Sequence, residues 1–222
     1  MYFDRKLPPS RDSVVWRYMD LAKYLSLIRR SELYFTRRSG LEALDPWEGF
    51  LGSSSHLSAD ERNFLGEWQR RPYINCWHVG SGESAAMWEV YKGRGFGVAV
   101  RSEWKRLGDS LDGEDVSVWG ELVRYVDYDE DGPEWGNVYH PLFYKRKAFE
   151  FEHEARLIVQ SVDDDAPEGR GIHVDIPTLI ESVVVSPFEP AWVADLIAEV
   201  TADLWPDVRV AASKLLEPPP AG

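Results

Sequence analysis

The segment Phe149–Val159, which reads FEFEHEARLIV, holds the residues best suited to acid–base chemistry. Alternation along a β-strand places Glu150, Glu152, Glu154 and Arg156 on one face, opposite a mostly apolar face. Three carboxylates on one strand face repel each other. Two interpretations follow. The face is exposed, with Glu152 or Glu154 paired to Arg156, or it presents a Glu-x-Glu pair to a cleft, where one carboxylate acts on a substrate and the other positions it.

A second candidate site lies in the segment NCWHVGSGESAAMWEVY, residues 75–91. A strand that ends in Cys76-Trp77-His78 leads through a glycine turn to a helix that begins near Glu83-Ser84. The free amides of a helix N-terminus favour an anion or an oxygen ligand. His78 is open to two interpretations, a structural histidine or a base. The residues at helical spacing, which is typical of core packing, are Met87, Trp88 and Tyr91.

Other catalytic patterns are missing from the sequence. There is no Gly-x-Ser-x-Gly motif, and five scattered histidines and one cysteine give no zinc spacing, so no metal site is expected. The glycines of Gly93–Gly97 fit neither the Rossmann nor the P-loop pattern. The triplet Lys145-Arg146-Lys147, with Arg37 and Arg38, is the main basic concentration. It is typical of a solvated face, but it precedes the Glu-rich strand and could supply phosphate contacts.

Short strands and helices must position these groups. β-Branched and aromatic runs predict strands over 14–19, 33–36, 72–79, 96–100, 121–128, 149–159, 171–176, 180–185 and 208–212. Helical spacing predicts helices over 21–30, 59–69, 83–91, 102–107 and 192–204, the first two begun by Asp20 and Ser58. In the last helix, the apolar residues on one face are Trp192, Leu196, Ile197 and Val200.

This order of elements predicts an α+β protein with a mixed, mostly antiparallel sheet and flanking short helices. We expect a single domain over 14–216, preceded by an N-terminal arm over 1–13 and followed by a frayed tail over 217–222.

Composition limits the function classes. The 222 residues include 38 acidic and 25 basic ones, and the net charge of −13 makes the chain a poor general binder of nucleic acid. A single cysteine, Cys76, expected to be buried and inert, cannot form an internal disulfide. With no signal-peptide pattern and no long apolar run, we expect a cytoplasmic protein with no membrane partner. Of ten tryptophans, several are expected to pack, Trp16 and Trp192 among them.

Most of the chain, from about Val14 to Pro187, resembles the bacterial domain-of-unknown-function family 2971. Some members of that family are described as abortive-infection or phage-defence proteins. The segments that carry the resemblance are VWRYMDLAKYLSLIRRSELYFTR, DPWEG, NCWHVGSGESAAMWEVYKGRGFGVAVRS, KRKAFEFEHEAR and VVVSP. Trp47, Trp77 and Trp88 fall within these segments, so they are the tryptophans to test as neighbours of the Glu-x-Glu pair.

A more distant resemblance is to ADP-ribosyltransferases. The strand with Arg17, the helix after it, and Leu33-Tyr34-Phe35 are similar to their first βαβ unit, whose first strand carries an Arg or His that holds NAD. Their catalytic Glu stands on a later strand, often in Glu-x-Glu, which Glu152-His153-Glu154 matches. Their middle strand often carries Ser-Thr-Ser, where this sequence has Asn75-Cys76-Trp77-His78.

The resemblance implies an ADP-ribosyltransferase-like core and a transferase that uses NAD to modify an unknown acceptor, protein or nucleic acid. It implies an effector or toxin of bacterial or phage defence, with a cognate antitoxin or a defence-system partner. Glu154 or Glu152 would hold the ribose hydroxyl and stabilise positive charge, and Arg17 would bind pyrophosphate or ribose. The NAD-binding residues implied in this way are Arg17, Tyr18, Trp77, His78, Trp88, Tyr91 and Arg156.

Three alternatives remain open. Arg17 could form an ordinary ion pair. The chain could be a non-catalytic sensor module of a defence system, which binds a ligand or a phage protein through a Trp-rich cleft. It could also be a nuclease that acts through its acidic cluster, although the sequence lacks the Asp/Glu spacing typical of a metal site.

Overall fold

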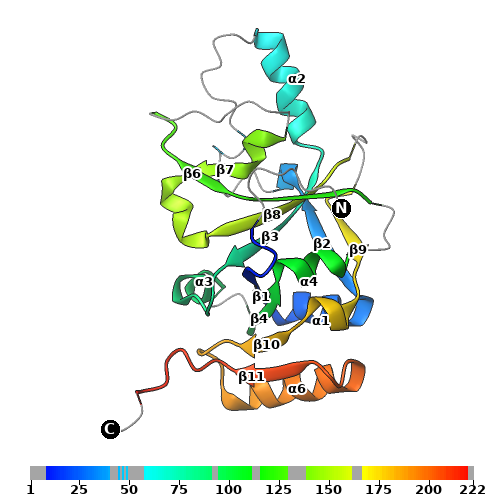
Figure 1. Ribbon diagram of the computed structural model, residues 1–222, viewed down its shortest axis with the longest axis vertical. Helices are drawn as coiled ribbons and strands as arrows, with labels where there is room; N and C mark the ends of the chain where they lie inside the picture. The colour runs from blue at the N-terminus through cyan, green and yellow to red at the C-terminus, as the bar shows by residue number, and fades with distance from the viewer. Residues whose placement is uncertain are drawn as a thin grey trace. The chain divides into compact units, whose positions relative to one another are not determined.

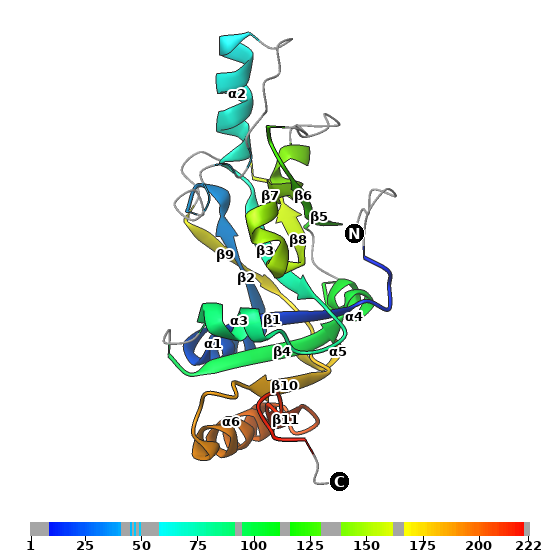
Figure 2. The ribbon, with the colours of Figure 1, turned by 90° about the vertical axis from the view of Figure 1, so that its left-hand side faces the viewer.

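The computed structural model describes residues 9–40, 45, 47, 49, 58–91, 95–111, 116–129, 139–161 and 167–219 (Figures 1 and 2). Most of the expected N-terminal arm and the end of the expected tail, residues 1–8 and 220–222, lie outside the described residues. The chain forms two compact units. Unit 1 comprises Met1–Pro9, Tyr34–Cys76 and Asp115–Ile172, and unit 2 comprises Ser10–Leu33, Trp77–Glu114 and His173–Gly222.

Unit 2 is built around an antiparallel strand pair, β1 (Val14–Asp20) and β4 (Gly97–Glu103), which stay in register from end to end. Strand β10 (Ser182–Val185) pairs antiparallel with β4, and β11 (Arg209–Ala212) pairs parallel with β10. The last residues of β3 (Tyr73–Val79) pair antiparallel with β1. The helices of this unit are α1 (Leu21–Arg30), α3 (Ala85–Tyr91), α4 (Trp104–Asp109), α5 (Ile176–Leu179) and α6 (Ala191–Leu204).

Local signals explain helix α1. Asp20 is its N-cap, and the Asp20 carboxylate accepts a hydrogen bond of 2.8 Å from the Lys23 amide. Arg29 and Arg30 occupy the last turn, where cations complement the helix dipole, and Ser31 ends the helix in a left-handed conformation with φ 54°. The predicted bounds of this helix and its predicted cap are confirmed.

Unit 1 contains a second antiparallel pair, β5 (Val118–Leu122) and β8 (Glu154–Val159). Strand β8 also pairs with β3, and β3 pairs antiparallel with β2 (Glu32–Arg37), which neighbours β9 (Gly169–His173). The short strands β6 (Arg124–Val126) and β7 (Tyr144–Arg146) pair parallel with each other. The helical elements are η1 (Arg38–Gly40), α2 (Ala59–Gln69), η2 (His140–Phe143) and η3 (Lys147–Glu152).

Strand β8 lies in the core of unit 1, since all six of its residues are buried. An apolar cluster of this unit consists of Ile74, Tyr139, Leu142, Phe143 and Ile158.

Helix α2 begins at the predicted cap. The Glu61 amide donates to the Ser58 hydroxyl at 3.3 Å, and the Ser58 amide donates to the Glu61 carboxylate at 2.8 Å. The predicted α+β class, with mostly antiparallel strands and flanking short helices, is confirmed.

The prediction of one strand over 149–159 is wrong in its first half. Lys147–Glu152 form the 3-10 helix η3, His153 has a left-handed backbone with φ 40°, and the strand begins only at Glu154. Glu152 therefore does not share a strand face with Glu154. The face that carries Glu154 and Arg156 is buried, so the exposed-face interpretation is wrong about exposure, whereas the ion pair that it predicted between Glu154 and Arg156 is present.

Two other predicted strands differ in extent from the observed ones. The predicted strand over 121–128 is interrupted at Val123, between β5 and β6. The strand predicted over 171–176 ends at His173, because Asp175 caps α5 by accepting a hydrogen bond of 2.9 Å from the Thr178 amide.

Of the four residues predicted on the apolar face of α6, only Ile197 is fully buried. Val193, Ile197 and Thr201 are buried, whereas Trp192 is 55% exposed and Leu196 is 41% exposed. Thr201 can lie in the core because its hydroxyl bonds both the Ile197 carbonyl and the Tyr24 hydroxyl, at 2.6 and 2.7 Å. The expected packing of Trp192 is therefore wrong. No helix in the described part of the chain is both long and apolar enough to span a lipid bilayer.

Candidate functional site

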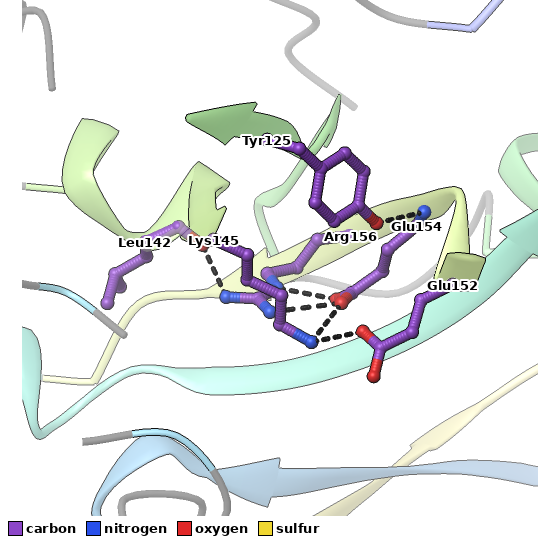
Figure 3. A network of polar contacts seen from close by, with 6 residues as sticks. All are labelled: Tyr125, Leu142, Lys145, Glu152, Glu154 and Arg156. Carbon is purple, nitrogen blue, oxygen red and sulfur yellow. Dashed lines mark hydrogen bonds and ion pairs between the residues drawn. The ribbon is translucent and has the colours of Figure 1, made fainter. Parts of the chain in front are cut away.

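A network of four charged side chains lies in unit 1, where strand β8, the end of η3 and strand β7 meet (Figure 3). Glu154 and Arg156 stand two residues apart on β8, so their side chains leave the same face of the strand. Glu152 comes from the last residue of η3, and Lys145 comes from β7. The structure thus brings together three of the predicted site residues and adds Lys145.

Glu154 and Arg156 form a bidentate ion pair. Arg156 Nε donates to Glu154 Oε1 at 2.7 Å, and Arg156 Nη2 donates to Glu154 Oε2 at 3.2 Å. Arg156 is 1% exposed and Glu154 is 4% exposed. Arg156 Nη1 also donates to the Leu142 carbonyl, and the Glu154 amide donates to the Tyr125 hydroxyl at 2.8 Å. The buried pair is therefore held by hydrogen bonds on several sides.

Lys145 connects the two carboxylates. Its Nζ lies 2.5 Å from Glu152 Oε2 and 2.7 Å from Glu154 Oε2. Two positive and two negative charges then balance within the network. Glu152 is its most open carboxylate, since its side chain is 25% exposed and that of Glu154 only 4%.

The two carboxylates differ in how readily they take a proton. Burial raises the pKa of Glu154, but the charges of Arg156 and Lys145 outweigh burial and hold that pKa well below its usual range. Burial raises the pKa of Glu152 above its usual range, against the opposing charge of Lys145. Glu152 therefore takes up a proton more readily than Glu154, and it is also the more exposed of the two carboxylates.

Beside this network lies a group of aromatic and charged side chains, Asp45, Trp47, Arg146 and Phe149, which we call the aromatic ledge. Arg146 Nη2 donates to Asp45 Oδ1 at 2.8 Å. The Arg146 guanidinium lies 6.0 Å from the Trp47 ring and 5.5 Å from the Phe149 ring. The Phe149 ring also lies 5.7 Å from Lys145 Nζ. Of the three candidate tryptophans, Trp47 is therefore the one that lies in unit 1, as the two carboxylates do.

Gly49 fixes the backbone next to the aromatic ledge. It is buried, with a left-handed φ of 74°, and a β-carbon there would lie 2.9 Å from Arg38 Nη2 and 3.2 Å from Leu142 Cδ2.

Replacing Gly49 by Ala is expected to lower the free energy of unfolding by about 2 kcal/mol, because the new side chain meets both backbone strain and close neighbours. Urea unfolding followed by circular dichroism measures the change. Gly66→Ala is the matched control. Gly66 lies inside α2 with no atom within 4 Å of its β-carbon position, so Ala should raise stability by about 0.5–1 kcal/mol. A loss of similar size in both variants would contradict the interpretation of Gly49.

The other predicted NAD-binding residues lie in unit 2 and form two groups on opposite faces of β1. Tyr18 is the centre of the first group, whose ring distances to it are 6.0 Å for His78, 4.8 Å for Trp88 and 6.3 Å for Tyr91. The Tyr18 hydroxyl accepts a hydrogen bond of 2.7 Å from the Ser84 amide. Arg17 points to the other face, where its guanidinium lies 6.0 Å from the Trp77 ring.

Burial limits what these aromatic residues can contact. Trp77 and Trp88 are each 1% exposed, and Tyr18 is 4% exposed. Trp88 Nε1 is already bonded to Glu83 Oε2 at 2.9 Å. Tyr18, Trp77 and Trp88 are therefore packed in the core of unit 2. Cys76, on β3, has a pKa that burial raises, which fits the expectation of an inert thiol.

Sequence reasoning missed Asp45 and Phe149 as site residues, and it treated Lys145 and Arg146 only as members of a basic triplet that could supply phosphate contacts. The DPWEG segment and that triplet were the available signals, but nothing in the sequence relates two segments 101 residues apart. Within the described residues, no group of three His, Cys, Asp or Glu side chains could hold a metal ion. No protein-family model and no curated protein matches this chain. The resemblance to family 2971 stays a prediction.

Proposed function

We propose that this chain is an ADP-ribosyltransferase-like enzyme that breaks the bond between nicotinamide and ribose in NAD, with Glu152 as the reacting carboxylate. One observation carries the proposal: two carboxylates contact the same lysine, but one is buried in an ion pair with an arginine and the other is partly exposed. Glu154 is neutralised by Arg156 in a buried pair, whereas Glu152 is partly exposed and has a raised pKa. Enzymes that need both an ionised and a proton-exchanging carboxylate separate the two in this way.

The chemistry assigned to Glu152 is as follows. The bond between ribose C1′ and the nicotinamide nitrogen breaks, and its electron pair leaves with that nitrogen, so positive charge develops on C1′ and the ring oxygen. The Glu152 carboxylate stabilises this charge. The acceptor, or water, then forms a bond to C1′ and gives its proton to Glu152, whose raised pKa suits a base.

Glu154 and Arg156 are positioning residues in this proposal. Arg156 fixes the charge and orientation of Glu154, and Glu154 holds Lys145 2.7 Å away, where Lys145 Nζ also bonds Glu152. The roles of Arg17, Tyr18, Trp77, His78, Trp88 and Tyr91 in NAD binding stay predictions from the resemblance. The acceptor, the defence-system partner and the cytoplasmic location also stay predictions.

The test is release of nicotinamide from labelled NAD by the purified full chain. Wild type should release nicotinamide, and Glu152→Gln should do so about 100-fold more slowly, because the amide neither stabilises the positive charge nor accepts the proton. Glu150→Gln is the matched control, since Glu150 is an exposed residue of the same 3-10 helix, and its rate should equal that of wild type. Equal rates for wild type and Glu152→Gln would remove Glu152 from the mechanism.

A second candidate function is a non-catalytic ligand-binding module. The burial of Glu154 and Arg156 agrees with the absence of catalysis in this alternative, because fully buried and mutually neutralised ion pairs are also found in purely structural networks. This function predicts no nicotinamide release by wild type, together with a rise in melting temperature when NAD is added.

A further inference from the structure

Helices α1 and α6 of unit 2 pack against each other and border an open apolar groove (Figure 1). The groove consists of two adjoining hollows. One, of about 330 Å³, lies between the two helices, and the other, of about 530 Å³, extends past the start of α1. The apolar side chains that line this α1–α6 groove include Leu21, Leu25, Phe96, Val200 and Leu204.

Two hydrogen bonds between the helices fix the walls of the groove. The Tyr24 and Thr201 hydroxyls bond each other at 2.7 Å, and Trp205 Nε1 donates to the Ile28 carbonyl at 2.8 Å. Because the second contact lies four residues beyond the first on both helices, α1 and α6 run in the same direction. The walls are thus held in place before any partner binds, which lowers the entropic cost of binding.

Helix α6 carries an exposed apolar row along the groove. Trp192 is 55% exposed, Leu196 is 41% exposed, and Val200 follows one turn later. The row is about 12 Å long at a rise of about 1.5 Å per residue. The Trp192 ring packs edge-on against the Phe96 ring with centroids 5.5 Å apart, so the row reaches the larger hollow. Apolar side chains that are exposed as one contiguous patch are typical of interaction sites.

An acidic row runs beside the apolar row on the same helix. Its members are Asp195, Glu199 and Asp203, which are exposed and stand four residues apart. None of the three forms an ion pair with any residue in the described part of the chain. Like charges four residues apart destabilise a helix, so a partner that brings positive charge relieves a cost that α6 carries alone.

These charges select the kind of partner. Among the described residues that line the groove or stand on the exposed face of α6, Arg29 is the one cation. A second copy of the chain would bring a like-charged row against this one, and an anionic lipid surface would also be repelled. A basic partner is attracted, both by the row and by the net charge of −13.

We propose that the α1–α6 groove is the docking site for a basic amphipathic helix of a partner protein. The apolar stripe of that helix covers Trp192, Leu196 and Val200, and Lys or Arg side chains beside the stripe pair with the acidic row. The partner segment is a helix because its side chains repeat at the same spacing as the two rows on α6, whereas those of a strand repeat every two residues. The site lies in unit 2 and does not depend on the function proposed for Glu152.

The experiment uses two designed helical peptides and the full chain. One peptide has a stripe of Leu, Lys along both edges of the stripe and Ala elsewhere, and the other has Glu in place of every Lys. Fluorescence anisotropy of the labelled peptides measures binding. The Lys peptide should bind at least ten-fold more tightly than the Glu peptide. Leu196→Ser, at an exposed position, should weaken binding of the Lys peptide at least ten-fold.

A charge reversal locates the acidic row. Asp195→Lys combined with Glu199→Lys should reverse the preference, so that the Glu peptide binds more tightly. The matched control is Asp12→Lys combined with Glu217→Lys, which changes the net charge equally at two exposed carboxylates of unit 2 outside the groove. The control should keep the preference of wild type. Trp192→Ala, which should weaken binding of the Lys peptide, gives a further test if the charge-reversed chain does not fold.

Several outcomes would overturn the proposal. Equal affinity of wild type for both peptides, or a reversed preference in the control, would leave only general charge attraction. Binding of the Lys peptide that survives Leu196→Ser would lie outside the groove. Self-association of wild type in sedimentation velocity that Leu196→Ser abolishes would assign the groove to a second copy. Binding to phosphatidylserine vesicles that depends on Leu196 would assign it to a membrane surface.

Discussion

Replacing Arg156 by Met is expected to lower the free energy of unfolding by about 3–5 kcal/mol. The methionine fills similar space, but it leaves Glu154 almost fully buried with Lys145 as its remaining cation partner. It also leaves the Leu142 carbonyl without the Arg156 donor. Urea unfolding at pH 7, followed by circular dichroism, measures the loss.

The control is an ion pair on the surface. Lys105 bonds Asp109 one turn along α4, with both side chains substantially exposed, so Lys105→Met should cost less than about 0.5 kcal/mol. The double variant Glu154→Gln with Arg156→Met should recover much of the loss, because no unpaired buried charge remains. If Arg156→Met costs no more than Lys105→Met, the pair does not stabilise unit 1 as described.

The second large effect is a contrast between Glu154→Gln and Glu152→Gln. The pKa of Glu154 is lowered in the folded state, so its ionised form adds stability above the unfolded pKa of about 4.3 and that stability is lost as pH falls further. Glu154→Gln should therefore cost about 3 kcal/mol at pH 7 and reduce the loss of stability on acidification. The pKa of Glu152 is raised, so its contribution is present at low pH and is lost as pH rises.

Glu152→Gln should consequently leave the free energy of unfolding at pH 7 unchanged within about 0.5 kcal/mol, or raise it. Lys145 keeps Glu154 as a partner at 2.7 Å in this variant. Urea titrations at pH 7 and pH 4 on both variants and wild type measure the contrast. Equal destabilisation by the two substitutions at pH 7 would show that both carboxylates are structural, which contradicts the roles assigned to them.

Helix starts were predictable because their signals are local. Asp20 and Ser58 each stand directly before a helical pattern and bond an amide within the next three residues, so one short window of sequence contains both partners. The interior strands were predictable for a similar reason, since β-branched and aromatic residues cluster in them. The buried face of a helix was harder to predict. In α6, Trp192 and Val193 belong to two apolar stripes, and the packing of α6 against α1 and β11 selects between them.

The break inside the Glu-rich segment was not predictable from its pattern. The sequence FEFEHEA alternates as a strand does, and the residue that interrupts it, His153, is not the glycine that usually marks a left-handed backbone. The partners in the site were hidden for a different reason. Asp45 finds Arg146 across 101 residues, and such pairings depend on the whole fold of unit 1 and not on any local pattern.

The left-handed turn at His153 also determines what a protein engineer could transplant. On a regular strand, Glu152 and Glu154 would stand in line on one face and repel each other, with no shared lysine between them. In this chain the reversal at residue 153 separates the 3-10 helix from β8, and both carboxylates reach the same ammonium group. The portable module is therefore the continuous stretch from Lys145 to Arg156, turn included. A Glu-x-Glu sequence grafted alone would not place both carboxylates in contact with one lysine.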